Sequence, residues 1–154
     1  MKNVRFPLLV LSLFLTLPLM AQKEEKSEKA IKAVIQQFFE GLEKGDTTLL
    51  KSTCTSQPVF QTYMADRDGK WQVFTEDFNE FVAFVGTPTK DKYREQIEFD
   101  AIMSEQALAS VWTPYKFYFN GKISHCGTNS FQLVKMDDGW KIQYILDTRR
   151  KGCK

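Results

Sequence analysis

Residues 107–150, ALASVWTPYKFYFNGKISHCGTNSFQLVKMDDGWKIQYILDTRR, decide the fold of this chain. Two dipeptides, Asn120-Gly121 and Asp138-Gly139, divide the stretch into three apolar-rich runs. Both dipeptides favour two-residue hairpin turns, because the central residues of such turns must accept a positive φ angle. The stretch therefore predicts three consecutive antiparallel strands. It also holds His125, the one histidine in the sequence.

Upstream of this stretch the apolar residues recur mainly at helical spacing. Predicted helices cover residues 27–44, a short segment after Asp46, and a segment that starts at Thr75 and ends at Gly86. Predicted extended segments cover 59–64, 71–74 and a run from Tyr93 to Met103 with period two. Helices come first and antiparallel strands last. This order predicts an α+β fold in which N-terminal helices pack on one face of a curved antiparallel sheet.

The N-terminal 21 residues have the pattern of a signal peptide. Lys2 and Arg5 precede an apolar run that ends near the small residue Ala21. The run is short for a membrane span, so a signal anchor is the weaker alternative. We expect a signal peptide at 1–21, a charged leader at 22–28, one domain at 29–150 and a tail at 151–154. The predicted location is periplasmic or secreted.

Charge excludes one class of partner. The chain has 21 basic and 19 acidic residues, and removal of Lys2 and Arg5 leaves 19 of each. Nucleic-acid binding needs a concentrated basic face, so we expect no nucleic-acid partner. We also expect no membrane partner once the signal peptide has been cleaved. A single histidine cannot build a zinc site with these cysteine spacings, so neither a metal nor a cofactor is predicted.

The three cysteines leave the disulfide pattern open. In an oxidising compartment Cys126 can pair with Cys153, because the predicted register places them diagonally on one face. A pair that includes Cys54, or three free thiols, remain alternatives, since sequence alone does not determine connectivity.

The turn registers predict which side chains share a face of the sheet. Counting from the two turns places Trp112 opposite Asn129 and Asn129 opposite Thr148. We assign this face to the helices, because its Leu133 end is the more continuously apolar. Its other end mixes apolar walls with a few polar groups, which predicts a ligand pocket there. A core histidine that packs against aromatic neighbours is the alternative, and a bulge at Pro114 would change the sides of one strand. The predicted ligand-binding residues are Trp112, Tyr118, His125, Asn129, Tyr144 and Thr148.

The opposite predicted face carries Tyr115, Phe117 and Phe119, an aromatic patch that predicts a homodimer through the sheet. Asp147 also falls on that face, so no carboxylate of the last three strands enters the predicted pocket. We therefore predict no catalytic residue, and the leading hypothesis is binding of a small hydrophobic or aromatic molecule. The alternatives are an enzyme with His125 as base and a protein-interaction module that uses the aromatic face.

Two segments resemble a known superfamily. AIKAVIQQFFEGLEKGD, residues 30–46, and FQLVKMDDGWKI, residues 131–142, are similar to the opening and the close of nuclear-transport-factor-2-like (SnoaL-like) proteins. The resemblance covers nearly all of the mature chain and is strongest to small exported bacterial members, including the lumazine-binding group.

The resemblance implies a cone-shaped α+β fold that encloses a pocket, often in a dimer. Members include steroid isomerases, polyketide cyclases, dehydratases and proteins of no known activity, so it implies no single reaction. The isomerase type needs a pocket carboxylate and an acidic hydrogen-bond donor, which the predicted pocket lacks.

Overall fold

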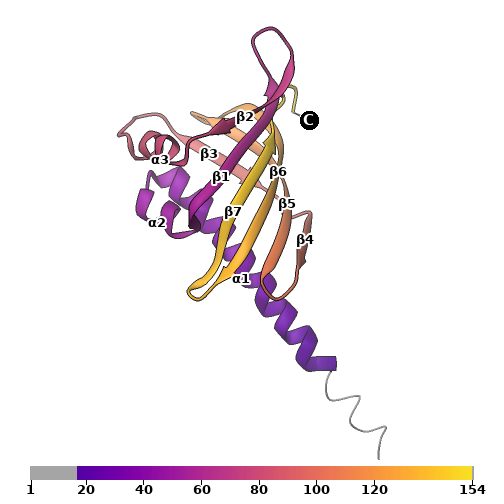
Figure 1. Cartoon of the computed structure of the whole chain (residues 1–154). Helices are drawn as coiled ribbons and strands as arrows, with labels where there is room; N and C mark the ends of the chain where they lie inside the picture. The colour runs from indigo at the N-terminus through magenta and orange to yellow at the C-terminus, as the bar shows by residue number, and fades with distance from the viewer. Residues whose placement is uncertain (1–16, 154) are drawn as a thin grey trace, which may run out of the picture.

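The computed structural model describes residues 17–153. The first 16 residues of the predicted signal peptide, and Lys154 of the tail, lie outside the described residues. The helices are α1 (Leu17–Lys44), α2 (Thr47–Ser52) and α3 (Phe78–Gly86). The strands are β1 (Cys54–Ala65), β2 (Trp71–Glu76), β3 (Tyr93–Ile97), β4 (Ala101–Ser104), β5 (Leu108–Phe119), β6 (Lys122–Met136) and β7 (Gly139–Thr148). They form one curved sheet in the order β2-β1-β7-β6-β5-β3, with β4 also paired to β5 (Figure 1).

The predicted α+β architecture is confirmed, with two differences in the sheet. The strand pair β1 and β7 is parallel, whereas the other pairs are antiparallel. The predicted single strand from Tyr93 to Met103 is divided into β3 and β4. The Asn120-Gly121 turn has the expected positive φ angles of 51° and 77°. The second turn is Asp137-Asp138, because Met136 pairs with Gly139.

Helix α1 begins before the predicted Ser27. The charged leader is part of the helix. The Lys29–Glu25 pair at 2.6 Å has the i,i+4 spacing that supports helix formation. Its first turns extend beyond the end of the sheet (Figure 1). Within residues 17–153, none of the helices combines the length and apolarity that a membrane span requires.

The other helices start at aspartate caps. Asp46 accepts hydrogen bonds from the Thr48 and Leu49 amides, as expected for the short helix α2. Asp77, rather than the predicted Thr75, caps α3, since strand β2 continues through Glu76.

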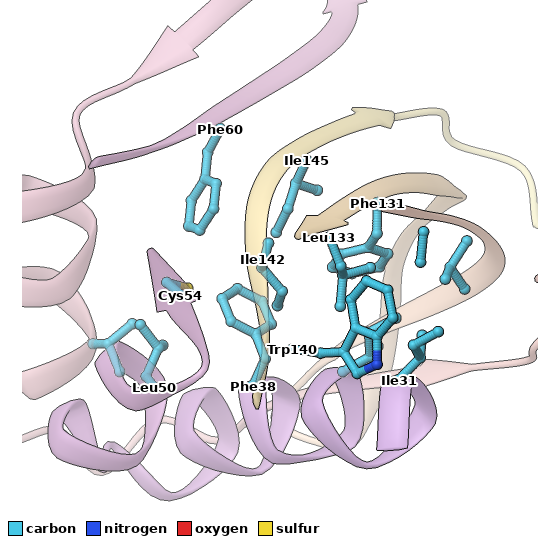
Figure 2. Packing of buried hydrophobic residues seen from close by; sticks show 14 residues of the cluster. Ile31, Phe38, Leu50, Cys54, Phe60, Phe131, Leu133, Trp140, Ile142 and Ile145 are labelled. Carbon is cyan, nitrogen blue, oxygen red and sulfur yellow. The ribbon is translucent and has the colours of Figure 1, made fainter. Parts of the chain in front are cut away.

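The core lies between α1 and the concave face of the sheet. The predicted apolar stripe of α1 is confirmed: Ile31 and Ile35 are fully buried, and Phe38 is nearly so. Figure 2 shows Ile31 and Phe38 against residues of β6 and β7. The sheet contributes Phe131, Leu133, Trp140, Ile142 and Ile145.

A β-bulge in β6 reverses the predicted sides of β5. Tyr118 pairs with Ile123, but the next pair along the strands is Phe117 with His125, so Ser124 is the extra residue. One extra residue on one strand of a pair changes which partner side chains share a face. The odd-numbered residues of β5 therefore join His125 on the concave face. Pro114, the predicted bulge position, pairs regularly with Thr128.

A β-bulge in β7 likewise reverses the predicted sides of the residues at the end of that strand. Ile142 pairs with Leu133, whereas Tyr144 pairs with Gln132, so Gln143 is the extra residue. Asp147 consequently lies opposite Asn129, on the concave face.

Several predicted side assignments are therefore wrong. Tyr115 is only 5% exposed and belongs to the concave side, as does Phe117. Of the three residues of the predicted aromatic patch, only Phe119, which is 41% exposed, lies at the surface, and the homodimer and the interaction module stay predictions. The residues that face away from the helices instead include four predicted ligand-binding residues, Trp112, Tyr118, Tyr144 and Thr148.

Candidate ligand-binding site

A cavity of about 290 Å³ lies between the helices and the concave face of the sheet. Its lining includes the apolar side chains Phe38, Phe39, Phe60, Phe81, Phe131 and Ile145. Its polar lining includes Glu76, Glu95, His125, Asn129, Asp147 and Arg149. Three of the lining residues, Phe84, Glu76 and Arg149, are exposed and mark its mouth.

Asp147 is the most highly connected of these polar groups. Its Oδ2 atom accepts a 2.9 Å hydrogen bond from the Tyr115 hydroxyl, and its Oδ1 atom accepts one from the Thr62 hydroxyl. The Arg149 Nε atom lies 3.8 Å from Oδ2. Asp147 is 9% exposed, so these hydrogen bonds take the place of the water that burial removes from its carboxylate.

Gly127 allows Tyr115 to reach this carboxylate. The two residues are cross-strand partners, and a Cβ atom at position 127 would lie 1.7 Å from the Thr148 carbonyl oxygen and 2.8 Å from the Tyr115 ring. The Tyr115 hydroxyl also lies 3.0 Å from the Thr148 carbonyl oxygen. Burial and the charge of Asp147 raise the pKa of Tyr115 far above its usual value, so the hydroxyl remains a proton donor.

Glu95 reaches the cavity from β3, between the half-buried Tyr93 and Ile97. Its Oε1 atom accepts a 2.7 Å hydrogen bond from the Asn129 side-chain amide, which lies 3.3 Å from the Thr113 hydroxyl as well. Burial raises the pKa of Glu95 to about 7; the Asn129 hydrogen bond opposes this shift, and Asp147 adds to it. Glu95 is thus a carboxyl group that titrates near neutral pH.

His125 is an uncharged aromatic wall of the site. Its ring stacks on Phe117 at 4.7 Å and meets Tyr115 edge-on at 5.9 Å, and its Nδ1 atom lies 3.2 Å from the Ser124 hydroxyl. Burial, with a smaller contribution from Arg149, lowers the pKa of His125 to about 4. His125 is therefore neutral at physiological pH, and the group that titrates near neutrality is Glu95.

The structure brings two of the six sequence-predicted site residues, His125 and Asn129, into the cavity. The other four lie on the opposite face. Trp112 is 49% exposed there, Tyr144 donates a 2.7 Å hydrogen bond to the Gln61 side chain, and Thr148 accepts one from the Thr128 amide. Tyr118 lines a separate, polar hollow that also includes Lys116 and Arg150.

Sequence reasoning missed the carboxylates of the cavity. A signal for Glu95 was present. It lies two residues from Tyr93 and two from Ile97 in a half-buried strand, and side chains two residues apart in a strand share one face. Asp147 had no such signal, since the bulge at Gln143 determines its side. Among residues 17–153, no group of three histidine, cysteine, aspartate or glutamate side chains is arranged to hold a metal ion.

No family model and no curated protein matches this chain. Solved structures do match. An NTF2-like protein of unknown function from Shewanella baltica has 17% identity and a TM-score of 0.63, over 82% of this chain and 96% of its own. A protein of unknown function from Mycobacterium tuberculosis has 14% identity and a TM-score of 0.67, over 86% of this chain and 76% of its own.

A candidate dehydratase of the NTF2-like family from Streptomyces avermitilis is also similar. It has 12% identity and a TM-score of 0.60, over 83% of this chain and 99% of its own. At these identities the similarity concerns the fold, and the chemistry must be argued from the cavity itself.

Proposed function

This chain has the nuclear-transport-factor-2-like fold, and on that premise we propose that it binds a small, mainly apolar molecule in the cavity between helices and sheet. The observation that carries the proposal is the composition of the cavity. Aromatic and aliphatic side chains form most of its wall, and a few polar groups converge at one end. Small-molecule sites have this composition, because apolar area supplies affinity while a few polar groups determine orientation.

The walls suit a ligand with a flat apolar body. The ring centroid of Phe38 lies 5.7 Å from that of Phe60 and 6.4 Å from that of Phe131, and the three rings form an aromatic floor. A polar group of the ligand would lie near Glu95, Asn129 and His125. The narrower resemblance to the lumazine-binding group stays a prediction.

Native mass spectrometry of protein purified from its own host would test the proposal. We expect a co-purified small molecule that a Leu42→Trp variant loses, because Leu42 lines the cavity and the larger ring would fill it. Leu49→Trp is the matched control, since Leu49 is also half-buried on a helix but is not among the lining residues. Equal ligand retention by both variants would contradict the proposal.

Proton transfer is a second candidate function, favoured by the pKa of Glu95. A carboxyl group with a pKa of about 7 in a largely apolar cavity can accept and return a proton at physiological pH. Glu95 would then take the role of base that the sequence suggested for His125. The test is hydrogen–deuterium exchange into small ketones in heavy water, which Glu95→Gln should abolish and the exposed Glu98→Gln should not.

Export is part of the proposed function. Its support is the signal-peptide pattern of residues 1–21 and the Cys126–Cys153 disulfide, since such bonds persist in oxidising compartments. Mass analysis of the protein from fractionated cells should find a mature chain that begins at Gln22 outside the cytoplasm. An uncleaved chain in the cytoplasmic fraction would contradict export.

A further inference from the structure

The cavity holds more negative than positive groups. Glu76, Glu95 and Asp147 supply three carboxylates and Arg149 supplies one guanidinium, so two carboxylates are in excess. Among residues 17–153, no lysine is one of the lining residues. His125 adds no charge at neutral pH, because its burial favours the neutral ring.

Arg149, the one cation among the described residues of the cavity, is already beside a carboxylate. Arg149 lies 3.8 Å from Asp147, and the two Asp147 oxygens also accept hydrogen bonds from Tyr115 and Thr62. Glu95 differs: among the described residues it forms no ion pair, and its hydrogen bond comes from the neutral amide of Asn129. A buried carboxylate without a cation is unfavourable, so the surroundings of Glu95 favour a cationic ligand over an anion.

Aromatic rings form a continuous wall next to this carboxylate. Phe84 meets Tyr93 at 5.6 Å, Tyr93 lies 6.4 Å from Phe117, and Phe117 stacks on His125 at 4.7 Å. The wall crosses from α3 over β3 and β5 to β6. The negative faces of aromatic rings attract organic cations, and carboxylates beside them strengthen that attraction.

We propose that the ligand of this cavity is an amine: an ammonium group placed against the Glu95 carboxylate, with an apolar or aromatic body on the wall formed by Phe84, Tyr93 and Phe117. This inference rests on the proposed binding function and specifies the class of ligand. An anionic ligand would face three carboxylates, and a neutral one would leave Glu95 without a counter-ion.

Binding should be coupled to proton release. In the empty cavity Glu95 is partly protonated near neutral pH, and an ammonium ion lowers its pKa, so the acid Glu95–COOH gives Glu95–COO⁻ and a free proton while the ligand keeps its own protons. At about pH 6 roughly one proton should leave per ligand bound, and at about pH 9 almost none.

Other titratable groups near Glu95 must be considered. On the cavity side these are Glu76 from β2, His125 from β6, Tyr115 from β5, and Asp147 with Arg149 from the end of β7, and burial raises the pKa of Glu76 as well. Tyr115 stays protonated and His125 stays neutral over this pH range.

The helix side contributes a further set of charges. Glu40, Glu43 and Lys44 of α1 share a second hollow with Glu95, and Lys44 is held by Glu40 at 2.5 Å. Loss of proton release in Glu95→Gln therefore assigns the released proton to Glu95 rather than to these groups or to Glu76.

Calorimetry with matched probes tests the proposal. Each triplet has one aromatic body, phenyl, indole or naphthalene, with an ethylammonium, hydroxyethyl or carboxyethyl group. We expect the amine of at least one triplet to bind at least tenfold more tightly than its alcohol and acid. The heat of binding at about pH 6 should vary with the ionisation enthalpy of the buffer, as proton release requires.

Glu95→Gln is the decisive variant, because glutamine keeps the hydrogen bond from Asn129 and removes the charge. It should lose at least tenfold in amine affinity and all buffer dependence, whereas Glu98→Gln, on an exposed residue outside the cavity, should lose neither. Thermal melts confirm that both variants fold.

The outcomes separate the two proposals. If alcohols or acids bind as well as amines, or if Glu95→Gln binds amines unchanged, the amine assignment is wrong while cavity binding stands. If no member of any triplet binds and no ligand co-purifies, both are wrong.

Discussion

Glu95 is a residue whose charge is opposed by its surroundings. Its pKa rises from 4.5 to about 7, so the folded protein binds more protons than the unfolded chain between these values. The contribution of Glu95 to stability is therefore fully present below about pH 4.5 and is lost as the pH rises through 7. Raised carboxyl pKa values of this kind cluster at functional sites.

Glu95→Gln should stabilise the protein at alkaline pH. The neutral amide has no charge to bury, so we expect the free energy of unfolding at about pH 8 to rise by on the order of 2 kcal/mol relative to the unsubstituted protein. Near pH 4 the two proteins should agree, since Glu95 is then protonated and His125 titrates alike in both. Urea unfolding at both pH values measures this, with Glu98→Gln as control. A gain of the same size at both pH values would show that charge is not the cause.

Gly127→Ala should be among the most destabilising single substitutions. The new methyl group would overlap the Thr148 carbonyl oxygen, and this contact is to backbone that cannot rotate away. We expect a loss of at least about 3 kcal/mol, because strands β6 and β7 must separate to admit it. Chemical denaturation measures the loss.

Gly69→Ala is the comparison for this substitution. A Cβ atom at position 69 meets nothing within 4 Å, so only its positive φ angle of 80° opposes the change. We expect it to cost about 1 kcal/mol. Equal losses for the two variants would mean that the close approach at Gly127 is relieved easily.

Among the elements, β7 connects the core to the cavity. Ile142, before the bulge, is fully buried in the core, whereas Asp147 and Arg149, after it, belong to the polar end of the cavity. Beyond the strand, the backbone of Arg150 exchanges hydrogen bonds of 3.0 Å and 2.9 Å with Cys126. The disulfide between Cys126 and Cys153 secures the same segment. The disulfide thus helps to position Arg149.

Cys153→Ser should loosen this end of β7. The bond joins cysteines 27 residues apart, so its loss should lower the free energy of unfolding by about 3 kcal/mol. The amide of Arg150 should exchange faster with solvent, while amides of the β6 core should retain their protection. Denaturation and hydrogen exchange measure the two effects.

The double variant Cys126→Ser/Cys153→Ser is the control. It should match the single variant closely, because either change removes the same bond. Cys54 is not expected to replace a missing partner, since it is buried and its pKa is raised to about 11, which keeps the thiol protonated. A much less stable double variant would show that Cys126 has a separate packing role.

On the scale of the whole molecule, the convex face of the sheet is the face opposite the core and the cavity. The outward side chains in its centre are uncharged, although 26% of the residues of the chain are charged. They include Val59, Tyr63, Ser110, Trp112, Thr128, Ser130, Gln132, Tyr144, Leu146 and Thr148. Extended uncharged surfaces with exposed aromatic rings are typical of association sites.

We expect the homodimer to form through this convex face rather than through Tyr115, Phe117 and Phe119. Trp112→Glu should then convert a dimer into a monomer in sedimentation equilibrium at micromolar concentration, because it places a charge in the centre of the face. Met136→Glu, which is similarly exposed but lies beside the β6–β7 turn, should remain dimeric. A monomeric unsubstituted protein would contradict the prediction.

Local physics made much of this fold predictable. The strands β5, β6 and β7, the Asn120-Gly121 turn, the apolar stripe of α1 and the Asp46 cap follow from side-chain periodicity, positive φ angles and short-range hydrogen bonds. Each of these features depends on residues close together in the sequence. The fold class therefore followed from the sequence alone.

The composition of the cavity was decided by tertiary structure. Ser124 and Gln143 carry no local mark of a bulge, yet each reverses the side of the residues beyond it. The sheet adopts them because curvature around α1 buries one set of side chains, and that set is chosen by packing between distant strands. Asp147 enters the cavity and Trp112 leaves it for this reason. The sequence determined which segments are strands and helices; only their packing decided which side chains face the ligand.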